Sequence, residues 1–184
     1  MDSHSQQVRT RPDRPAVALI DPFTALDRTH RETMDHLRSL QAMLVTLEAQ
    51  GIDGVARAIA GSVCSFFSGG ARDHHVVEEQ QVFPALLRSG NSELVQQVHR
   101  LQQDHGWIEE DWLELAPQLA AIADGNGGYD LEALKHGIEV FSKLYHEHIS
   151  LEESLIYPEA RRRLAIEEEA AGQRGKTGGQ PHIG

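Results

Sequence analysis

A repeat of about 75 residues constrains this chain more than any other feature of its sequence. The stretch HHVVEEQQVFP begins at His74, and the related stretch HISLEESLIYP begins at His148. Placing His74 on His148 superposes a histidine, a Glu-Glu pair, a β-branched residue, an aromatic residue and a proline. Two matches at equal spacing indicate that the residues shared by both stretches have a function, and they select which polar side chains to consider.

The periodicity of apolar residues predicts an all-α fold. Apolar side chains recur every three or four residues in four stretches, about 22–51, 53–88, 91–123 and 130–169. Asp21, Asn91 and Asp130 are predicted N-caps, and Ser68-Gly69-Gly70 and Pro84 predict a kink or break in the second stretch. Strand-like alternation is nearly absent, so long helices with short connections favour an antiparallel up-down four-helix bundle.

Composition and the ends of the chain set further expectations. Residues 1–20 are predicted to be a flexible arm, 21–170 the bundle, and 171–184 a disordered tail. The net charge of −11 argues against binding to nucleic acid or to an anionic membrane. No apolar run is long enough for a membrane span, and the N-terminus lacks a signal-peptide pattern, so we expect a cytoplasmic protein. The single cysteine, Cys64, excludes an intrachain disulfide and a multi-cysteine metal site.

The repeat also selects among the 11 histidines of the chain. The first and third helical stretches repeat more weakly, and there His30 falls on His105. His75 is excluded as a ligand because its counterpart is Ile149, which cannot bind a metal, although His75 and His146 could still donate a hydrogen bond from outside the site. Four further histidines have counterparts that are not histidines and are excluded in the same way: His36, His99, His136 and His146.

The spacing of the selected residues has a physical meaning. Four residues span about one helical turn, so His74 and Glu78 project from one face of their helix, as do the matching residues of the second copy. His30 and His105 lie on the apolar stripes of their own helices. Six such groups in a bundle interior would be costly unless paired or metal-bound, and they suit two divalent ions with bridging carboxylates. The predicted metal ligands are His30, His74, Glu78, His105, His148 and Glu152.

These motifs resemble the hemerythrin-like, HHE cation-binding family of di-iron four-helix proteins, over roughly residues 22–160. The resemblance implies two iron ions bridged by the two glutamates and by an oxo or hydroxo group. It also implies that His30 and His74 hold one iron, and that His105 and His148 hold the other. Imidazole and carboxylate ligands alone do not separate iron from manganese or zinc.

One position departs from the pattern of oxygen-carrying hemerythrins, which have a further histidine one turn before the third-helix ligand. Leu101 stands there, so we expect an additional open position on the second iron, which Glu109 or water could fill. The pattern is more similar to bacterial proteins linked to nitric-oxide stress and iron–sulfur repair. Because the single cysteine is Cys64, we do not expect the cysteine-containing N-terminal segment that some of those proteins carry.

Open coordination positions imply a small ligand, namely oxygen, nitric oxide or hydrogen peroxide, bound for sensing, storage or stress response. A di-iron enzyme of peroxidase-like or nitric-oxide-reducing type is the alternative, and iron storage or delivery is a third. An enzyme would need a proton donor, for which Glu109, Tyr145 and Tyr157 are the candidates. Glu79 and Glu153 either accept an imidazole N–H beside the metals or lie on solvated helix faces.

Overall fold

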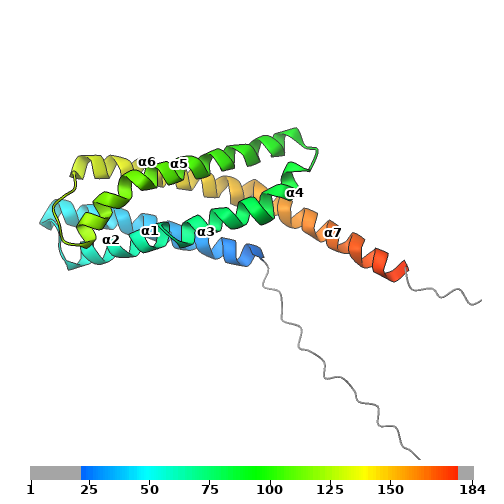
Figure 1. Ribbon diagram of the computed structural model, residues 1–184, viewed down its shortest axis with the longest axis horizontal. Coiled ribbons are helices and arrows are strands. Elements are labelled where there is room, and N and C mark those ends of the chain that lie inside the picture. The colour runs from blue at the N-terminus through cyan, green and yellow to red at the C-terminus, as the bar shows by residue number, and fades with distance from the viewer. Residues whose placement is uncertain (1–21, 178–184) are drawn as a thin grey trace, which may run out of the picture.

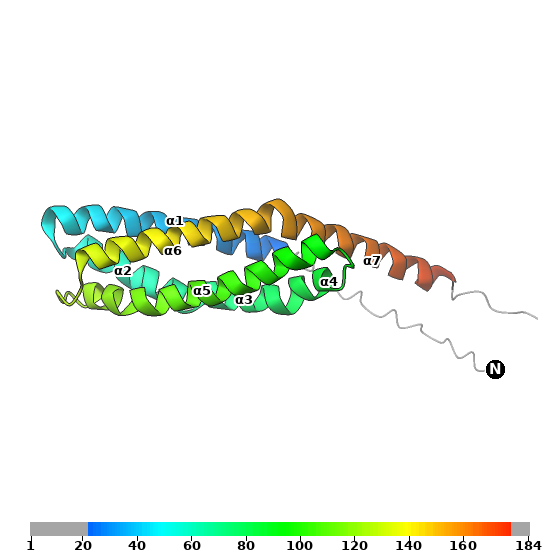
Figure 2. The same cartoon turned by 90° about the horizontal axis from the view of Figure 1, so that it is seen from above.

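The computed structural model describes residues 22–177, and within this range the chain forms helices and no strand. The all-α prediction is therefore confirmed for this part of the chain. The longest elements are α1 (Pro22–Gln50), α5 (Ser92–Ala123), α6 (Leu131–Leu151) and α7 (Tyr157–Thr177). Shorter helices, α2 (Gly54–Phe67), α3 (Gly70–Val77) and α4 (Phe83–Leu87), connect α1 to α5. The elements pack side by side as a helical bundle, and the end of α7 projects beyond it (Figures 1 and 2).

The helix ends follow from local side-chain chemistry. The Asn91 carboxamide oxygen accepts hydrogen bonds from two backbone N–H groups at the start of α5, and Asp130 accepts one from Ala133 in α6. These two predicted caps are confirmed, and Asp53 caps α2 in the same way. Asp21, the proposed arm at 1–20 and residues 178–184 of the proposed tail lie outside the described residues. Helix α7 continues to Thr177, past the predicted end of the bundle at residue 170.

The interruptions of the second helical stretch take two forms. Helix α2 ends at Phe67 and α3 begins at Gly70, so the break predicted at Ser68-Gly69-Gly70 is present. Around Pro84 the chain instead forms a π-helical turn, η1 (Glu78–Val82). An equivalent turn, η2 (Glu152–Ile156), joins α6 to α7 just before the second repeated proline.

The π turns let the helix continue into each proline. Proline has no N–H group, and its ring clashes with the carbonyl four residues earlier in a regular α-helix. In η1 the Phe83 N–H bonds to the Glu78 carbonyl, and in η2 the Tyr157 N–H bonds to the Glu152 carbonyl, five residues earlier in each case. Such single π turns are frequent at functional sites. Here each one begins at a repeated glutamate.

The apolar core is divided into two clusters with a polar layer between them. The larger cluster includes Leu37 of α1 and Ile138 of α6, and the smaller one includes Leu26 of α1 and Ile156 of η2. His30 lies between the two clusters along α1, and the other predicted ligands are placed in the same way on their helices. Each fully buried leucine contributes about 1.5–3 kcal/mol, so these clusters are the main source of bundle stability. None of the described helices is long and apolar enough to span a membrane.

Candidate metal centre

All six predicted ligands meet in the polar layer, and none is more than 7% exposed. They come from the four helical stretches of the bundle. The first supplies His30 (α1), the second His74 (α3) and Glu78 (η1), the third His105 (α5), and the fourth His148 (α6) and Glu152 (η2). Because both glutamates open a π turn, the helix widens where each carboxylate enters the interior.

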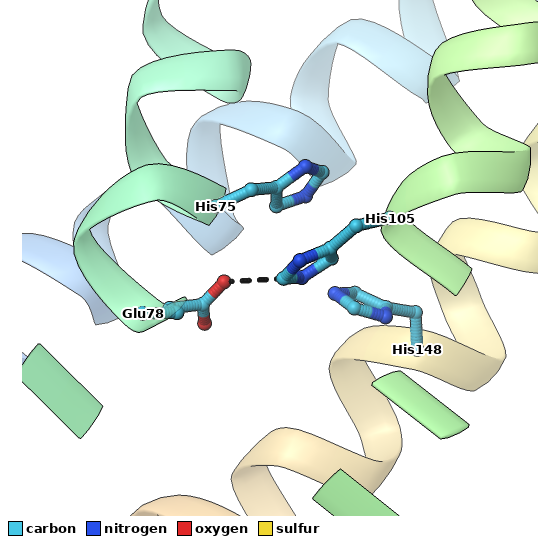
Figure 3. Close-up of side chains that lie close together, drawn as sticks. All are labelled: His75, Glu78, His105 and His148. Atoms are coloured by element: carbon cyan, nitrogen blue, oxygen red, sulfur yellow. Dashed lines mark ion pairs between the residues drawn. The ribbon is translucent and has the colours of Figure 1, made fainter. Parts of the chain in front are cut away.

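The Glu78 carboxylate faces two different histidines with its two oxygens. Its Oε1 lies 3.4 Å from Nε2 of His74, one helical turn away on the same stretch. Its Oε2 lies 3.5 Å from Nε2 of His105, on α5 across the bundle, and Figure 3 shows this contact as the dashed line. Glu78 therefore spans two groups of ligands.

The Glu152 carboxylate is arranged in the same way. Its Oε2 lies 3.1 Å from Nε2 of His30, and its Oε1 lies 3.1 Å from Nε2 of His148. We call His30 and His74 the His30 half of the centre, and His105 and His148 the His105 half. Each glutamate offers one oxygen to each half. Two ligand atoms bound at right angles about 2.1 Å from one ion lie roughly 3 Å apart, which is close to these four distances.

Unsatisfied polar atoms show that the residues fit a cation. Among the described residues, Glu78 Oε2, both Glu152 carboxylate oxygens and the Nε2 atoms of His105 and His148 are buried without a hydrogen-bond partner. An unpaired buried polar group costs about 1–3 kcal/mol, and an unpaired charge costs more. Once deprotonated, these atoms carry lone pairs that converge on the same layer, so divalent metal ions would satisfy them together.

The pKa values of the two glutamates are strongly shifted, in opposite directions. Burial and the neighbouring Glu152 charge raise the pKa of Glu78 to about 7. Burial acts in the same direction on Glu152, but the positive charges of His148 and His30 outweigh it and hold the pKa of Glu152 well below its usual range. Without metal, one carboxylate is thus ionised and the other is partly protonated at neutral pH.

The pKa values of two of the histidines are shifted in opposite directions. Burial alone would lower the pKa of His148, but the Glu152 charge and the Asp104 carboxylate raise it to about 10. Burial and the nearby charge of His30 lower the pKa of His74 to about 3. Burial alone would also lower the pKa of His30, but the neighbouring glutamates raise it. Because a metal ligand must be deprotonated, a bound cation would have to compete with protons on His148, Glu78 and His30 but not on His74.

Two outer carboxylates, which lie outside the ligand set, orient His30 of α1 and His105 of α5. The Nδ1–H of His30 donates to Glu153 Oε1 at 3.1 Å, and the Nδ1–H of His105 donates to Glu79 Oε1 at 2.9 Å. A proton on Nδ1 leaves the Nε2 lone pair free, and Nε2 is the atom that faces the glutamates. The two roles that the sequence leaves open for Glu79 and Glu153 are combined, because both carboxylates accept this hydrogen bond and are also about half exposed.

Asp104 is a buried acid of the site that the sequence does not reveal. It is 2% exposed, and its Oδ2 lies 3.8 Å from Nδ1 of His148. Its repeat counterpart is Thr29, so the comparison of the two copies gives no signal for it. Its position directly before His105 in a helix rich in acidic residues does not distinguish it either.

The aromatic residues of the repeat make the two halves different. The Tyr157 hydroxyl donates to Glu78 Oε1, lies 3.2 Å from His30 Nε2, and its ring stacks on His30. Burial raises the pKa of this phenol, which keeps it a hydrogen-bond donor. Its counterpart Phe83 stacks on His105 and offers no donor. Of the three candidate proton donors, Tyr157 is therefore the one whose hydroxyl is hydrogen-bonded to a predicted ligand, whereas Tyr145 makes only a ring-edge contact with His148.

His75, which the repeat excludes as a ligand, lies against the His105 half (Figure 3). Its ring stacks on His105 with centroids 4.0 Å apart and planes 12° apart, and its centroid is 5.5 Å from that of His148. One ligand atom each from His75, Glu78, His105 and His148 lies within 4.8 Å of the others. The repeat misses His75 because its counterpart, Ile149, belongs to the apolar core.

Glu109 does not fill the coordination position that is expected to be open because Leu101 replaces a histidine. Leu101 is fully buried in the smaller apolar cluster. Glu109 lies at the surface, where its Oε1 is 3.0 Å from the Arg72 guanidinium and its side chain is 53% exposed. Among the described residues, Glu109 is not one of those whose ligand atoms lie close enough together to hold a metal ion.

Two hollows lead toward the centre. A cavity of about 510 Å³ is lined by His75, His105 and Tyr145, and by Arg72 and Glu109. A second hollow of about 470 Å³ between α1 and α6 is lined by His30, Met34, Ile149 and Glu153, among others. One predicted histidine ligand of each half therefore lies at the wall of a hollow.

Two comparisons with known proteins give a match. An uncharacterized protein of Haemophilus influenzae is 28% identical over 135 residues, which cover 73% of this chain and 76% of that protein. No solved structure gives a significant match. Residues 21–160 match the hemerythrin HHE cation binding domain, with all six predicted ligands inside the matched range. The chain therefore belongs to the hemerythrin HHE cation binding domain family.

Proposed function

We propose that this protein holds a dinuclear non-haem iron centre that binds oxygen, nitric oxide or hydrogen peroxide for sensing, storage or stress response. The observation that carries the proposal is that Glu78 and Glu152 each present one oxygen to each half of the centre. Family membership supports a metal, typically iron, although manganese or zinc would suit the same donors. An antiparallel up-down order of the four helical stretches and a cytoplasmic location belong to the same proposal.

Each residue has a defined part in this proposal. His30 and His74 hold one ion, His105 and His148 hold the other, and the two glutamates bridge them. Iron in such a site supplies redox chemistry and coordination positions for a small ligand. The chain contributes a buried layer between two apolar clusters, which limits the access of water. The outer carboxylates keep the Nε2 lone pairs of His30 and His105 directed inward.

A di-iron enzyme is the second candidate, and Tyr157 is the observation that favours it. A buried phenol in contact with both Glu78 and His30 is placed to donate a proton beside the His30 half. Turnover of hydrogen peroxide or nitric oxide by the wild-type protein, lost in Tyr157→Phe with both metals retained, would identify an enzyme. Binding without turnover would identify a carrier or sensor.

Metal analysis and optical spectroscopy test the main proposal. Protein purified aerobically and reconstituted with Fe(II) under anaerobic conditions should retain two iron ions per chain after desalting. The oxidised form should absorb in the near ultraviolet, and the reduced form should change its spectrum on addition of nitric oxide. At most one tightly held ion, or a preference for zinc with no response to any of the three ligands, would contradict the proposal.

A further inference from the structure

We propose that His75 is a fifth histidine ligand, which binds the metal of the His105 half together with His105 and His148. The proposal rests on the dinuclear centre proposed above. It gives the role of a metal ligand to a residue that the internal repeat excludes. His75 would supply the imidazole that Leu101 cannot.

The geometry of the His105 half supports this assignment. His75 leaves α3 three residues before Glu78, and its ring lies over the His105 ring, between α3 and α5 (Figure 3). Ligand atoms of His75, Glu78, His105 and His148 already lie within 4.8 Å of one another, and three of these four are predicted ligands. A cation bound to those three would therefore meet the fourth.

The surroundings of His75 leave few other roles for it. It is packed against three further imidazoles, with ring centroids 4.0 Å from His105, 5.5 Å from His148 and 5.7 Å from His74. Its other ring contact is Tyr145, at 6.1 Å. A cluster of three buried imidazoles and the half-buried His75 offers several acceptor nitrogens in a small space, and a shared cation would satisfy them together.

A ligand at His75 changes the distribution of imidazoles between the two ions. The His105 half then has three imidazoles and the His30 half has two, with the glutamates shared by both. The position expected to be open beside Leu101 is filled from α3, and the less crowded ion is the one in the His30 half. A small ligand would then bind next to the Tyr157 hydroxyl, which lies 3.2 Å from His30 Nε2.

A matched pair of histidine variants tests the assignment. We compare His75→Ala with His146→Ala, because His146 is an exposed histidine on α6 whose Nδ1 bonds to the Ser142 carbonyl. Each variant is reconstituted anaerobically with Fe(II), desalted and analysed for iron. We expect two ions in the wild type and in His146→Ala, and one in His75→Ala. The second ion of His75→Ala should be held at least about 100-fold more weakly in a chelator competition.

Rescue with free imidazole separates a lost ligand from a damaged fold. The cavity of about 510 Å³ that His75 lines is large enough to admit imidazole to the space left by His75→Ala. Added imidazole should restore the second iron equivalent in His75→Ala and leave the wild type and His146→Ala unchanged. The conservative variant His75→Gln fills the same space without an imidazole, and it should hold one ion without rescue.

The outcomes distinguish this proposal from the one on which it rests. A wild-type protein that retains fewer than two ions overturns the dinuclear centre itself. A wild type with two ions and a His75→Ala variant that also retains two, with unchanged competition by the chelator, overturns only the role of His75. Loss of metal from His75→Ala that imidazole does not restore also overturns it, because a general disturbance of the layer then explains the loss.

Discussion

The His30 half and the His105 half of the centre are built from the same repeated residues but have different surroundings. In each half, a histidine of a long helix donates its Nδ1–H to an outer glutamate and directs Nε2 toward a shared carboxylate. The His30 half is closed by the Tyr157 phenol, whereas the His105 half has Phe83 at the equivalent place and His75 beside it. The halves thus share their ligand framework and differ in donors, packing and access.

This difference shows what an internal repeat can and cannot reveal. Residues that recur, such as Glu78 and Glu152, have a task common to both copies. Residues that differ, such as Tyr157 and Phe83, determine what each copy does separately. The first kind predicts that metal is bound, and the second kind would set where a small ligand binds in the proposed centre.

The largest effect should come from removing what the halves share. The double variant Glu78→Ala with Glu152→Ala should lose both metal ions, because the four contacts between carboxylate oxygens and Nε2 atoms all involve these side chains. Iron content after anaerobic reconstitution measures the loss. Glu147→Ala on α6, whose side chain is 52% exposed, is the control and should keep two ions. Retention of two tightly bound ions by the double variant would show that the glutamates do not bridge.

Removing the metals should lower the thermal stability of both halves together. A metal that binds only the folded state stabilises it by about 2.7 kcal/mol at a hundredfold excess over its dissociation constant. For a chain of this size, about 1 kcal/mol shifts the melting temperature by roughly 2–4 °C. We therefore expect the metal-free protein to melt at least about 5 °C below the loaded protein at pH 7.5. Equal melting temperatures would argue against a preorganised site.

The stabilisation by metal, measured as the difference in melting temperature, should decrease as the pH is lowered. In the metal-free protein the pKa of Glu78 is about 7 and that of His148 is about 10, both raised above their unfolded values. Lowering the pH therefore keeps His148 protonated and adds a proton to Glu78, and a metal must displace both protons. The difference in melting temperature between loaded and metal-free protein should shrink from pH 7.5 to pH 5.5. A larger difference at pH 5.5 would contradict this assignment.

The sequence predicts the shared parts of the site better than the parts that differ. Helix positions and caps follow from local patterns, so the convergence of the six polar side chains could be anticipated. The π turns at Glu78 and Glu152 could not, because a proline in a helical pattern indicates a disturbance without specifying its form. His75 and Asp104 depend on how α3, α5 and α6 face one another across the bundle, and neither residue has a counterpart in the repeat that would reveal it.

The outer carboxylates should each act on one half. Glu79→Ala should weaken metal binding in the His105 half, and Glu153→Ala should weaken it in the His30 half, each by about 10- to 100-fold. The effect should lie at the lower end of this range because both carboxylates are about half exposed. Chelator competition with Fe(II)-loaded protein measures it. Glu79→Gln and Glu153→Gln retain an acceptor for the Nδ1–H and should lose less, and an equal loss would assign the effect to charge alone.

The smallest effect should come from making the two halves alike at their aromatic positions. Tyr157→Phe removes the hydroxyl that donates to Glu78 and leaves the ring that stacks on His30, so the His30 half becomes equivalent to the half containing Phe83. Both iron ions should be retained, with a loss of about 1 kcal/mol in metal affinity, or roughly fivefold.

Azide, an anionic probe of open coordination positions, extends this comparison to small ligands. If the less crowded ion is in the His30 half, Tyr157→Phe should weaken azide binding, because the hydroxyl beside that ion is lost. Phe83→Leu alters the packing of the other half without removing a hydrogen-bond donor, and it should leave azide affinity unchanged. Optical titration of the oxidised protein measures both constants. Weaker binding in Phe83→Leu but not in Tyr157→Phe would place the open position in the His105 half, and His75 would then be a neighbour of the bound ligand instead of a ligand to the metal.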